Sequence, residues 1–491
     1  MSGKRKFIYF FIGGVMIIAP LLFYYLSKGG FIFEAVKENN NIGVKKSEEN
    51  YLEKKEDHNI NIDIPNPKNI ILITIESARY DHFGFMGYPR ETTPFLSELS
   101  KRALIFENMI TPIPITFPSH ASIFSGLYPQ VTEIRINNDK LDDEVFSLAE
   151  YLKEKDYKTG AFVSASSISF HNLDQGFDTY EIVKMNEEER PENPRVGHRS
   201  AEETMALAYE WLDEQEEDDR VFLWVHLDEP HMLWMDIVPE YVETREDVNI
   251  SDDDLYKYLV EDQYITDIEN AVRIGYPEEL MGTKTDQDLM IMGINRYDGA
   301  IQKVDSVIEN LYKYFENREM IDESLWFVLA DHGEGIGTHN YRGHSDKIYQ
   351  EQIRTPLIIH SPSMNEGYRL SYLSENVDIL PTISEIVGFN LNKGYKINGK
   401  SLLSYIKDKK GREFVYSITP TNKAYSIQNE KYKYIYHDKE IIKYGKVVNE
   451  DMFFDLENDP YEQNNLLGTM PEVEEEMKNE ILRRVVSYEK N

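Results

Sequence analysis

Residues 69–84 read Asn-Ile-Ile-Leu-Ile-Thr-Ile-Glu-Ser-Ala-Arg-Tyr-Asp-His-Phe-Gly, and this stretch decides the fold. It opens with a short isoleucine-rich apolar run, typical of a strand buried on both faces, as in a parallel sheet. Similar runs follow at residues 221–225, 325–329 and 357–359. Helical patterns lie between the runs, at residues 93–101, 146–155, 201–214 and 301–315. Strands alternating with helices predict an α/β protein with helices on both faces of its sheet.

Charged and polar residues follow these apolar runs, and ligands in such sheets bind at the carboxyl ends of strands. The carboxylates and imidazoles in these places are Glu76, Asp228, His231, Asp331 and His332. If they converge at one edge, they repel one another or are buried at high cost unless a cation joins them. A divalent metal ion with oxygen and nitrogen ligands resolves this conflict, so the pattern favours a metal site.

Thr116 lies in a separate segment, Pro-Ile-Thr-Phe-Pro-Ser-His at residues 114–120. A threonine hydroxyl bound to a metal ion becomes an alkoxide nucleophile at neutral pH. Alternatively, Thr116 only caps a helix that starts near Pro118 or Ser119. The local residues leave both interpretations open.

The order of these segments resembles the sulfatase family of the alkaline phosphatase superfamily, from about residue 68 to about residue 467. The similar segments are residues 69–84, the nucleophile-like Thr-Phe-Pro-Ser-His at 116–120, Ala-Asp-His-Gly-Glu-Gly at 330–335, and residues 349–359, 378–382 and 455–460. The resemblance implies a sulfatase-like, mixed and largely parallel sheet flanked by helices. A small C-terminal antiparallel sheet is expected beside it, with a strand near residues 432–436 and a helix at about 473–486.

The resemblance also implies roles for particular residues. Glu76, Asp331 and His332 are expected to bind a divalent metal ion (Mn, Mg, Ca or Zn). Thr116 is expected to be the nucleophile and the fourth ligand. His231 matches a family histidine near the leaving group and is a candidate general acid.

Three further histidines and one aspartate complete the set of candidates. His120 takes the place of an arginine in the family signature, where it orients Thr116 or contacts the substrate. Asp228, His226 and His344 bind a second metal ion in one interpretation. In the simpler interpretation there is one metal ion, and His231 and His344 contact the substrate.

Three departures from the family pattern bear on the reaction. Threonine cannot become the formylglycine that sulfatases make from Cys or Ser, and Glu76 stands where most sulfatases carry Asp. Glu76 with Thr116 resembles the lipoteichoic acid synthases and phosphoethanolamine transferases, and Thr-Phe-Pro also resembles nucleotide pyrophosphatase/phosphodiesterases. Residues 160–165, Gly-Ala-Phe-Val-Ser-Ala, lack the Lys and His with which arylsulfatases hold sulfate.

These departures predict a hydrolase or transferase acting on a phosphoester, of the phosphodiester, phosphoglycerol or phosphoethanolamine type, through a covalent Thr116 intermediate. One alternative is a sulfuric ester hydrolase acting on a sulfate ester or sulfated glycan. Another is a non-catalytic binding protein on the same fold.

The N-terminus predicts a membrane anchor. Lys4, Arg5 and Lys6 precede an apolar run at residues 7–26, close to the ~20 residues that span a bilayer as a helix. The basic cluster predicts a cytoplasmic tip with the bulk of the chain outside the cell membrane. The expected parts are an anchor at 1–30, a stalk at 31–67, a catalytic domain at 68–390 with an acidic insertion at 235–287, and a C-terminal subdomain at 391–491.

The overall composition narrows the class of partner. Acidic residues outnumber basic ones 87 to 53, for a formal net charge of −34, so nucleic acid is not an expected partner. An anionic phosphate or sulfate ester is compatible with this charge only where a metal ion reverses the local field. The chain has no cysteine, which excludes disulfides, thiol catalysis and a formylglycine made from cysteine.

Overall fold

The computed structural model describes residues 66–168, 171–183, 197–231, 286–421, 423–438, 442–443, 446–447 and 450–488. All of them belong to one compact unit, Leu52–Asn491. The predicted anchor, most of the predicted stalk and nearly all of the predicted acidic insertion lie outside the described residues. Within the described part of the chain, no helix is both long and apolar enough to cross a bilayer.

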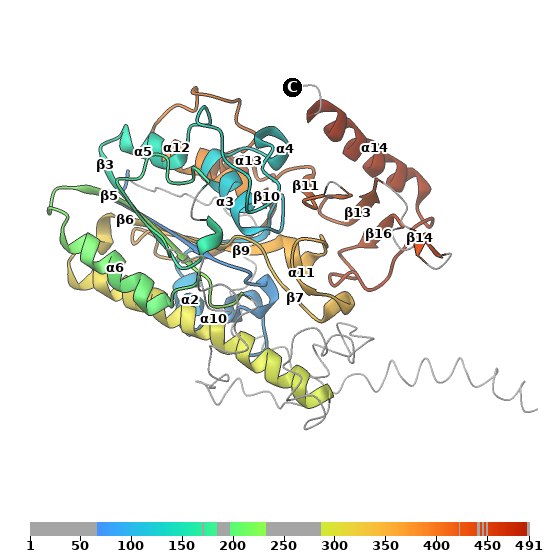
Figure 1. Cartoon of the computed structure of the whole chain (residues 1–491), viewed down its shortest axis with the longest axis horizontal. Helices are drawn as coiled ribbons and strands as arrows, with labels where there is room; N and C mark the ends of the chain where they lie inside the picture. The colour runs from blue at the N-terminus through green and yellow to red at the C-terminus, as the bar shows by residue number, and fades with distance from the viewer. Residues whose placement is uncertain are drawn as a thin grey trace, which may run out of the picture. The chain divides into compact units, whose positions relative to one another are not determined.

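The core is an eight-stranded sheet, and it confirms the predicted α/β class (Figure 1). Its strands, from edge to edge, are β10 (Tyr368–Glu375), β2 (Leu104–Ile110), β9 (Arg354–His360), β6 (Ser324–Ala330), β1 (Asn69–Ile75), β5 (Arg220–Leu227), β3 (Tyr157–Val163) and β4 (Thr179–Glu181). The four apolar runs of the sequence are therefore β1, β5, β6 and β9. Within this sheet, β9 alone runs antiparallel to its neighbours, so the sheet is mixed but largely parallel.

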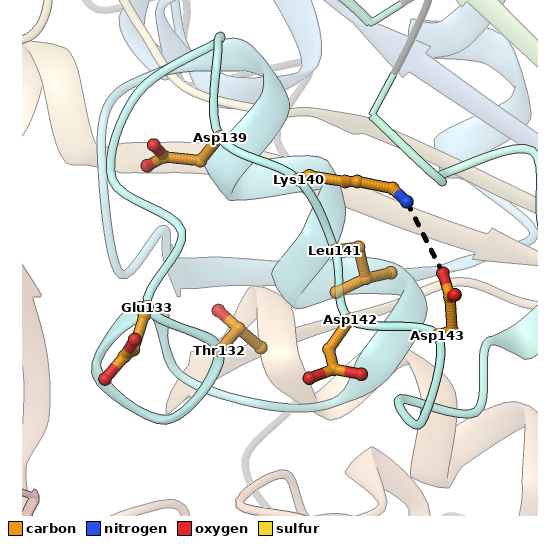
Figure 2. Close-up of a pocket in the computed structure, with 7 residues that line it drawn as sticks. All are labelled: Thr132, Glu133, Asp139, Lys140, Leu141, Asp142 and Asp143. Carbon is orange, nitrogen blue, oxygen red and sulfur yellow. Dashed lines mark ion pairs between the residues drawn. The ribbon is translucent and has the colours of Figure 1, made fainter.

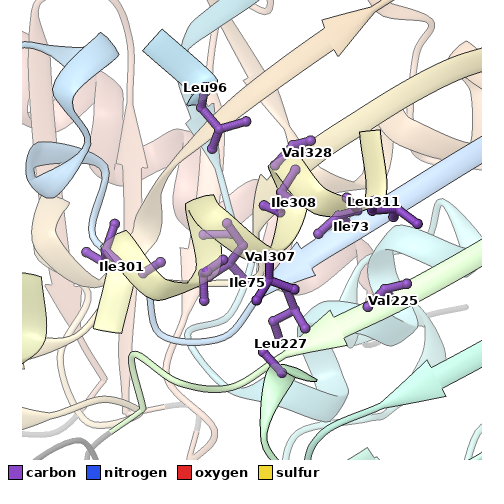
Figure 3. Packing of buried hydrophobic residues seen from close by; sticks show 14 of the residues in the cluster. Ile73, Ile75, Leu96, Val225, Leu227, Ile301, Val307, Ile308, Leu311 and Val328 are labelled. Carbon is purple, nitrogen blue, oxygen red and sulfur yellow. The ribbon is translucent and has the colours of Figure 1, made fainter. Parts of the chain in front are cut away.

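One face of the sheet is covered by α2 (Pro94–Ser100), α6 (Ala201–Asp213) and α10 (Asp286–Asn317) (Figure 1). Ile301, Ile308 and Leu311 of α10 join Ile73 and Ile75 of β1 in one buried cluster (Figure 3). Each such side chain contributes about 1.5–3 kcal/mol when it leaves water. Burial on both faces explains why residues 70–73 of β1 form a continuous apolar run rather than an alternating pattern.

The other face carries α3 (Thr116–Ser125), α5 (Leu148–Lys153), α12 (Ile379–Val387) and α13 (Leu402–Asp408). Capping boxes at Ser147 and Ser200 start α5 and α6, so these two helices match their predicted positions closely. The helix predicted at residues 301–315 corresponds to α10, which is longer than predicted. It begins at Asp286, before the apolar pattern of the sequence becomes regular.

A small antiparallel sheet near the C-terminus confirms the predicted second sheet. Its strands are β11 (Val415–Ile418), β12 (Ala424–Gln428), β13 (Tyr432–His437) and β16 (Met452–Asp455), and α14 (Pro471–Tyr488) packs on β12 and β13. Lys433 of β13 is fully buried, with its Nζ 2.6 Å from Glu462 Oε1. The same Nζ donates to the backbone oxygen of Ile348 at 2.6 Å, which ties this sheet to the main body.

Candidate active site

Three neighbouring strands end at the same level, and this brings the first candidates together. Ile75, the last residue of β1, pairs with Leu227 of β5 on one side and with Ala330 of β6 on the other. Glu76 N donates to Leu227 O at 2.8 Å, and Asp331 N donates to Ile75 O at 3.2 Å. The residues that directly follow these strands are Glu76, Asp228 and Asp331. Their convergence therefore follows from parallel register alone.

Thr116 joins them from α3, a helix on one face of the sheet. The Thr116 hydroxyl donates to Glu76 Oε1 at 2.7 Å, and both side chains are buried. The helix begins at Thr116 itself, and its cap residue, Ile115, makes no side-chain cap bond. Asn137 Oδ1 accepts the first free helix N–H, from Phe117, at 2.9 Å. The interpretation of Thr116 as a helix cap is therefore wrong, because another residue does that work and the hydroxyl faces the carboxylate.

Asp331 and His332 present ligand atoms toward each other. Asp331 Oδ1 accepts from Ser77 N at 3.1 Å and from His332 N at 2.7 Å. The His332 ring lies with Nδ1 2.9 Å from Gly333 O, so Nδ1 carries the proton and Nε2 carries a lone pair. That Nε2 lies 3.5 Å from Asp331 Oδ2, and neither atom has a hydrogen-bond partner among the described residues. Two acceptors facing each other in a buried site fit a shared cation.

Glu76 and His226 repeat this arrangement on the neighbouring strand. Glu76 Oε2 lies 3.4 Å from His226 Nε2, and both atoms are buried without a hydrogen-bond partner. An unpaired buried carboxylate costs several kcal/mol unless a charge of opposite sign offsets it. The donor set therefore fits a divalent metal ion held by Glu76, Asp331 and His332, with His226 as an additional candidate ligand.

His120 lies next to this set but is committed elsewhere. Among the described residues, His120, His226 and Asp331 offer ligand atoms within 4.8 Å of one another. However, His120 Nδ1 lies 2.7 Å from Thr116 O, and Nε2 lies 2.9 Å from the Thr74 hydroxyl. Both ring nitrogens thus have protein partners, and the ring is fully buried. This geometry supports the predicted orienting role of His120 rather than contact with a substrate.

We call Glu76, Thr116, His226, Asp331 and His332 the inner cluster. The pKa shifts of its titratable residues describe a site that avoids charge when no cation is present. Burial, and then the charge of Asp228, raises the pKa of Glu76 to about 7. Burial, and then the charge of Glu76, raises the pKa of Asp331 well above its usual range. Burial and neighbouring imidazoles lower the pKa of His226 and His332 well below the usual value. A bound cation reverses the carboxylate shifts, because it favours the ionised forms.

A second group of histidines lies nearer to solvent, and we call it the rim: His198, His231 and His344. His344 Nδ1 lies 3.2 Å from Glu334 Oε2, and His198 Nδ1 bonds Asp228 Oδ2. Burial opposes protonation of both rings, but their carboxylate partners raise their pKa values. The ring centroid of His231 lies 5.9 Å from that of His198 and 5.3 Å from that of His344.

Among the residues that the structure describes, no carboxylate lies at hydrogen-bond distance from His231. Its Nε2 lies 3.7 Å from Glu76 Oε1, and its Nδ1 has no hydrogen-bond partner. Burial, and then the charges of His344 and His198, lowers its pKa well below the usual value. The general-acid role of His231 stays a prediction, and it requires a negatively charged substrate to offset this shift.

Among the described residues, Asp228, His226 and His344 do not form a group whose ligand atoms lie within 4.8 Å of one another. Asp228 binds His198, His226 faces Glu76, and His344 binds Glu334. This geometry favours the simpler prediction of one metal ion with His231 and His344 facing the substrate. Sequence reasoning missed His198 and Glu334, and it assigned His226 only to a second metal ion. Glu334 lies in the quoted Asp-His-Gly-Glu segment, but no local signal marks His198.

A pocket of about 460 Å³ lies away from this cluster, on the loop after α4 (Pro129–Thr132) (Figure 2). Its lining residues are Thr132, Glu133, Asp139, Lys140, Leu141, Asp142 and Asp143. None of them belongs to the inner cluster or the rim. The loop matters to the site through Asn137, which caps α3 beside Thr116.

Comparison with known proteins agrees with this fold. The chain belongs to the sulfatase family, whose Sulfatase domain it matches at residues 68–389. Residues 339–487 match the C-terminal domain of N-sulphoglucosamine sulphohydrolase. The chain is a sulfatase-like hydrolase, and members of this family typically bind a divalent metal ion.

Individual relatives are distant. The chain is 26% identical to an ulvan-active sulfatase of Formosa agariphila, over 84% of this chain and 79% of that protein. A protein solved with its substrate D-glucosamine-2-N,6-O-disulfate has a TM-score of 0.64 at 18% identity, covering 87% of this chain and 99% of that one. A phosphonate monoester hydrolase of Agrobacterium radiobacter has a TM-score of 0.64 at 15% identity, covering 86% and 96%. The structural likenesses show the shared fold.

Proposed function

We propose that the chain is a metal-dependent hydrolase of sulfate esters, with sulfated glycans as the substrate class. The observation that carries this proposal is the match to the sulfatase family over residues 68–389, in a chain whose buried Thr116 hydroxyl lies 2.7 Å from Glu76 Oε1 and beside unpartnered ligand atoms. Its sulfatase relative and the disulfated-glucosamine complex support the substrate class.

A divalent ion held by Glu76, Asp331 and His332 would neutralise the ester oxygens and lower the pKa of the Thr116 hydroxyl. Thr116 Oγ1 then forms a bond to sulfur as the bond from sulfur to the leaving oxygen breaks. The Thr116 hydroxyl proton is lost to solvent as the alkoxide forms, because the ion that Glu76 would hold favours the ionised form of that carboxylate. His231 supplies a proton to the leaving oxygen. Water afterwards cleaves the threonine ester and restores Thr116.

A second candidate function is phosphoester cleavage or transfer, of the kind performed by lipoteichoic acid synthases and phosphoethanolamine transferases. The unmodified Thr116 hydroxyl favours it, because threonine carries no aldehyde and forms a simple ester intermediate. The fold likeness to a phosphonate monoester hydrolase is compatible with this chemistry.

One set of assays separates the candidates. Purified protein is loaded with Mn²⁺, Mg²⁺, Ca²⁺ or Zn²⁺ and given 4-nitrophenyl sulfate, bis(4-nitrophenyl) phosphate and a sulfated polysaccharide. We expect turnover of the sulfate esters, and mass spectrometry of a quenched reaction to find the transferred group on Thr116. Preferential turnover of the phosphodiester would overturn the sulfate-ester proposal in favour of phosphoester cleavage or transfer. If no ester is cleaved and no metal ion is bound, the chain is a binding protein on this fold.

We also propose that residues 7–26 anchor the chain in the cell membrane, with the hydrolase outside the cytoplasm. The basic residues before this apolar run support that orientation. Protease added to intact cells is expected to release the hydrolase domain. Full protection of the domain, with cleavage only after lysis, would contradict the orientation.

A further inference from the structure

His198 lies at the carboxyl end of β3, although nothing in the sequence marks it as a site residue. His198 forms an isolated antiparallel bridge with Ala165, just beyond that strand. Arg199 N donates to Ser164 O at 2.8 Å, and Ser166 N donates to Gly197 O at 2.7 Å. These backbone bonds hold the short segment around His198 beside the strand end.

The ring of His198 is oriented by one contact on its inner side. Nδ1 donates to Asp228 Oδ2, which directly follows β5. Nε2 has no hydrogen-bond partner within the parts of the chain that the structure describes. The side chain is 24% exposed, as is that of His231, whose ring lies beside it. One nitrogen is therefore held by a carboxylate while the ring keeps an accessible surface next to the candidate acid.

The residues at the end of β3 carry no cationic side chain: residues 160–163 of the strand and the two positions after it are Gly-Ala-Phe-Val-Ser-Ala. The neighbouring guanidinium of Arg199 is committed to Val163 O at 2.9 Å and to Thr204 Oγ1 at 3.2 Å.

The His231 ring lies beside both other rim histidines, with its centroid 5.9 Å from that of His198 and 5.3 Å from that of His344. Its Nε2 lies 3.7 Å from Glu76 Oε1, so an anion bound at the inner cluster would lie next to the rim. The carboxylate of Asp228 offsets the positive charge of a protonated His198 ring. His198 can therefore serve as a cation at this strand end without a further partner from the protein.

We infer that His198 binds a non-bridging oxygen of the substrate's sulfuryl or phosphoryl group through Nε2, while Asp228 holds the ring in place. This inference rests on the proposed function, because it assumes that a tetrahedral anionic ester occupies the inner cluster. It assigns substrate binding to a residue outside every segment that carries the family resemblance.

Two substitutions test the contact by separating the two ring nitrogens. His198→Asn keeps a donor near the position of Nδ1, facing Asp228, and removes Nε2. His198→Gln places an amide nitrogen near the position of Nε2. His437→Asn, on β13 of the small sheet, is the matched control. The probes are inorganic phosphate and inorganic sulfate, titrated calorimetrically into the metal-loaded full chain and used as competitive inhibitors of ester cleavage.

We expect His198→Asn to raise the Kd and Ki of both anions about ten- to a hundred-fold, the effect of losing one hydrogen bond to a charged group. His198→Gln should recover part of this loss, and His437→Asn should change neither constant. Metal content should equal that of the wild type in all variants. KM should rise more than kcat falls.

Unchanged anion affinity in His198→Asn would overturn the inference, as would loss of bound metal, which would make His198 a ligand instead. Failure of the proposed function looks different. If the wild type cleaves neither ester yet binds phosphate or sulfate with the same dependence on His198, the reaction is wrong and the contact stands.

Discussion

The inner cluster and the rim are built from the same residue types but treat their polar atoms differently. In the inner cluster, Glu76 Oε2, Asp331 Oδ2 and His332 Nε2 are buried without partners. In the rim, His198 and His344 are each held by a carboxylate and reach toward solvent. Missing partners indicate a place for a cation, since native proteins pair almost all buried polar groups. Paired imidazoles indicate side chains that must keep one orientation when a substrate arrives.

Replacing Thr116 should have the largest effect. We expect Thr116→Ala to lower turnover by several orders of magnitude, because no other group in the inner cluster forms the covalent intermediate. Its lost hydrogen bond to Glu76 should cost only about 0.5–1.5 kcal/mol of stability. Turnover and melting temperature are to be measured on the same preparation.

Thr116→Ser is the companion variant, because it keeps a hydroxyl and should stay active at similar stability. An active Thr116→Ala protein would remove Thr116 from the mechanism and leave the inner cluster as a metal site only.

Replacing an inner carboxylate should abolish metal binding. We expect Glu76→Gln to lose the bound ion, measured by elemental analysis, together with activity. A chelator should then lower the melting temperature of the wild type but not of the variant. Metal at a hundred times its Kd stabilises the folded state by about 2.7 kcal/mol.

Glu375→Gln is the matched control, since Glu375 is a buried carboxylate paired with Arg412 at 3.0 Å in another part of the sheet. It should lose stability and keep its metal. Equal metal content in the two variants would contradict the assignment of Glu76 as a ligand.

The buried ion pair of Lys433 and Glu462 contrasts with the unpartnered carboxylates of the inner cluster. Each of its charges has a partner, and the pair takes no part in the reaction. We expect Lys433→Met to destabilise the fold by about 3–5 kcal/mol, because it leaves Glu462 buried without its partner. Turnover per folded molecule should change little. Lys431→Met, on an exposed side chain two residues away, should have a much smaller effect on stability. Denaturant unfolding compares the two, and similar costs would show that burial does not control the effect.

Asn137→Ala should have a smaller effect than the replacements of Thr116, Glu76 and Lys433. It removes the acceptor for Phe117 N and should cost about 0.5–2 kcal/mol, the usual range for a helix cap. Because the same cap fixes the start of α3, a few-fold drop in turnover should accompany it. A drop as large as that of Thr116→Ala would mean that the loop takes part in the reaction directly.

Much of the fold follows from local sequence. The runs at residues 69–75, 221–225 and 325–329 are strands because continuous apolar stretches need burial on both faces. Parallel register then brings Glu76 and Asp331 to one edge without further information. Other strands were missed, β2 among them, because their burial patterns are mixed and resemble other elements.

Only the tertiary structure decided how the site's polar atoms are paired. Three hydrogen-bonded pairs in the site join residues that lie between 30 and 46 positions apart in the chain. These pairs are Thr116 with Glu76, His120 with Thr74, and His198 with Asp228. Such contacts depend on how α3 and the segment after β4 pack against the strand ends. Local propensity carries no information on that packing, whereas apolar periodicity does specify which residues form strands. The sequence by itself therefore determined the sheet and its reactive edge, and packing determined which imidazoles remain available there.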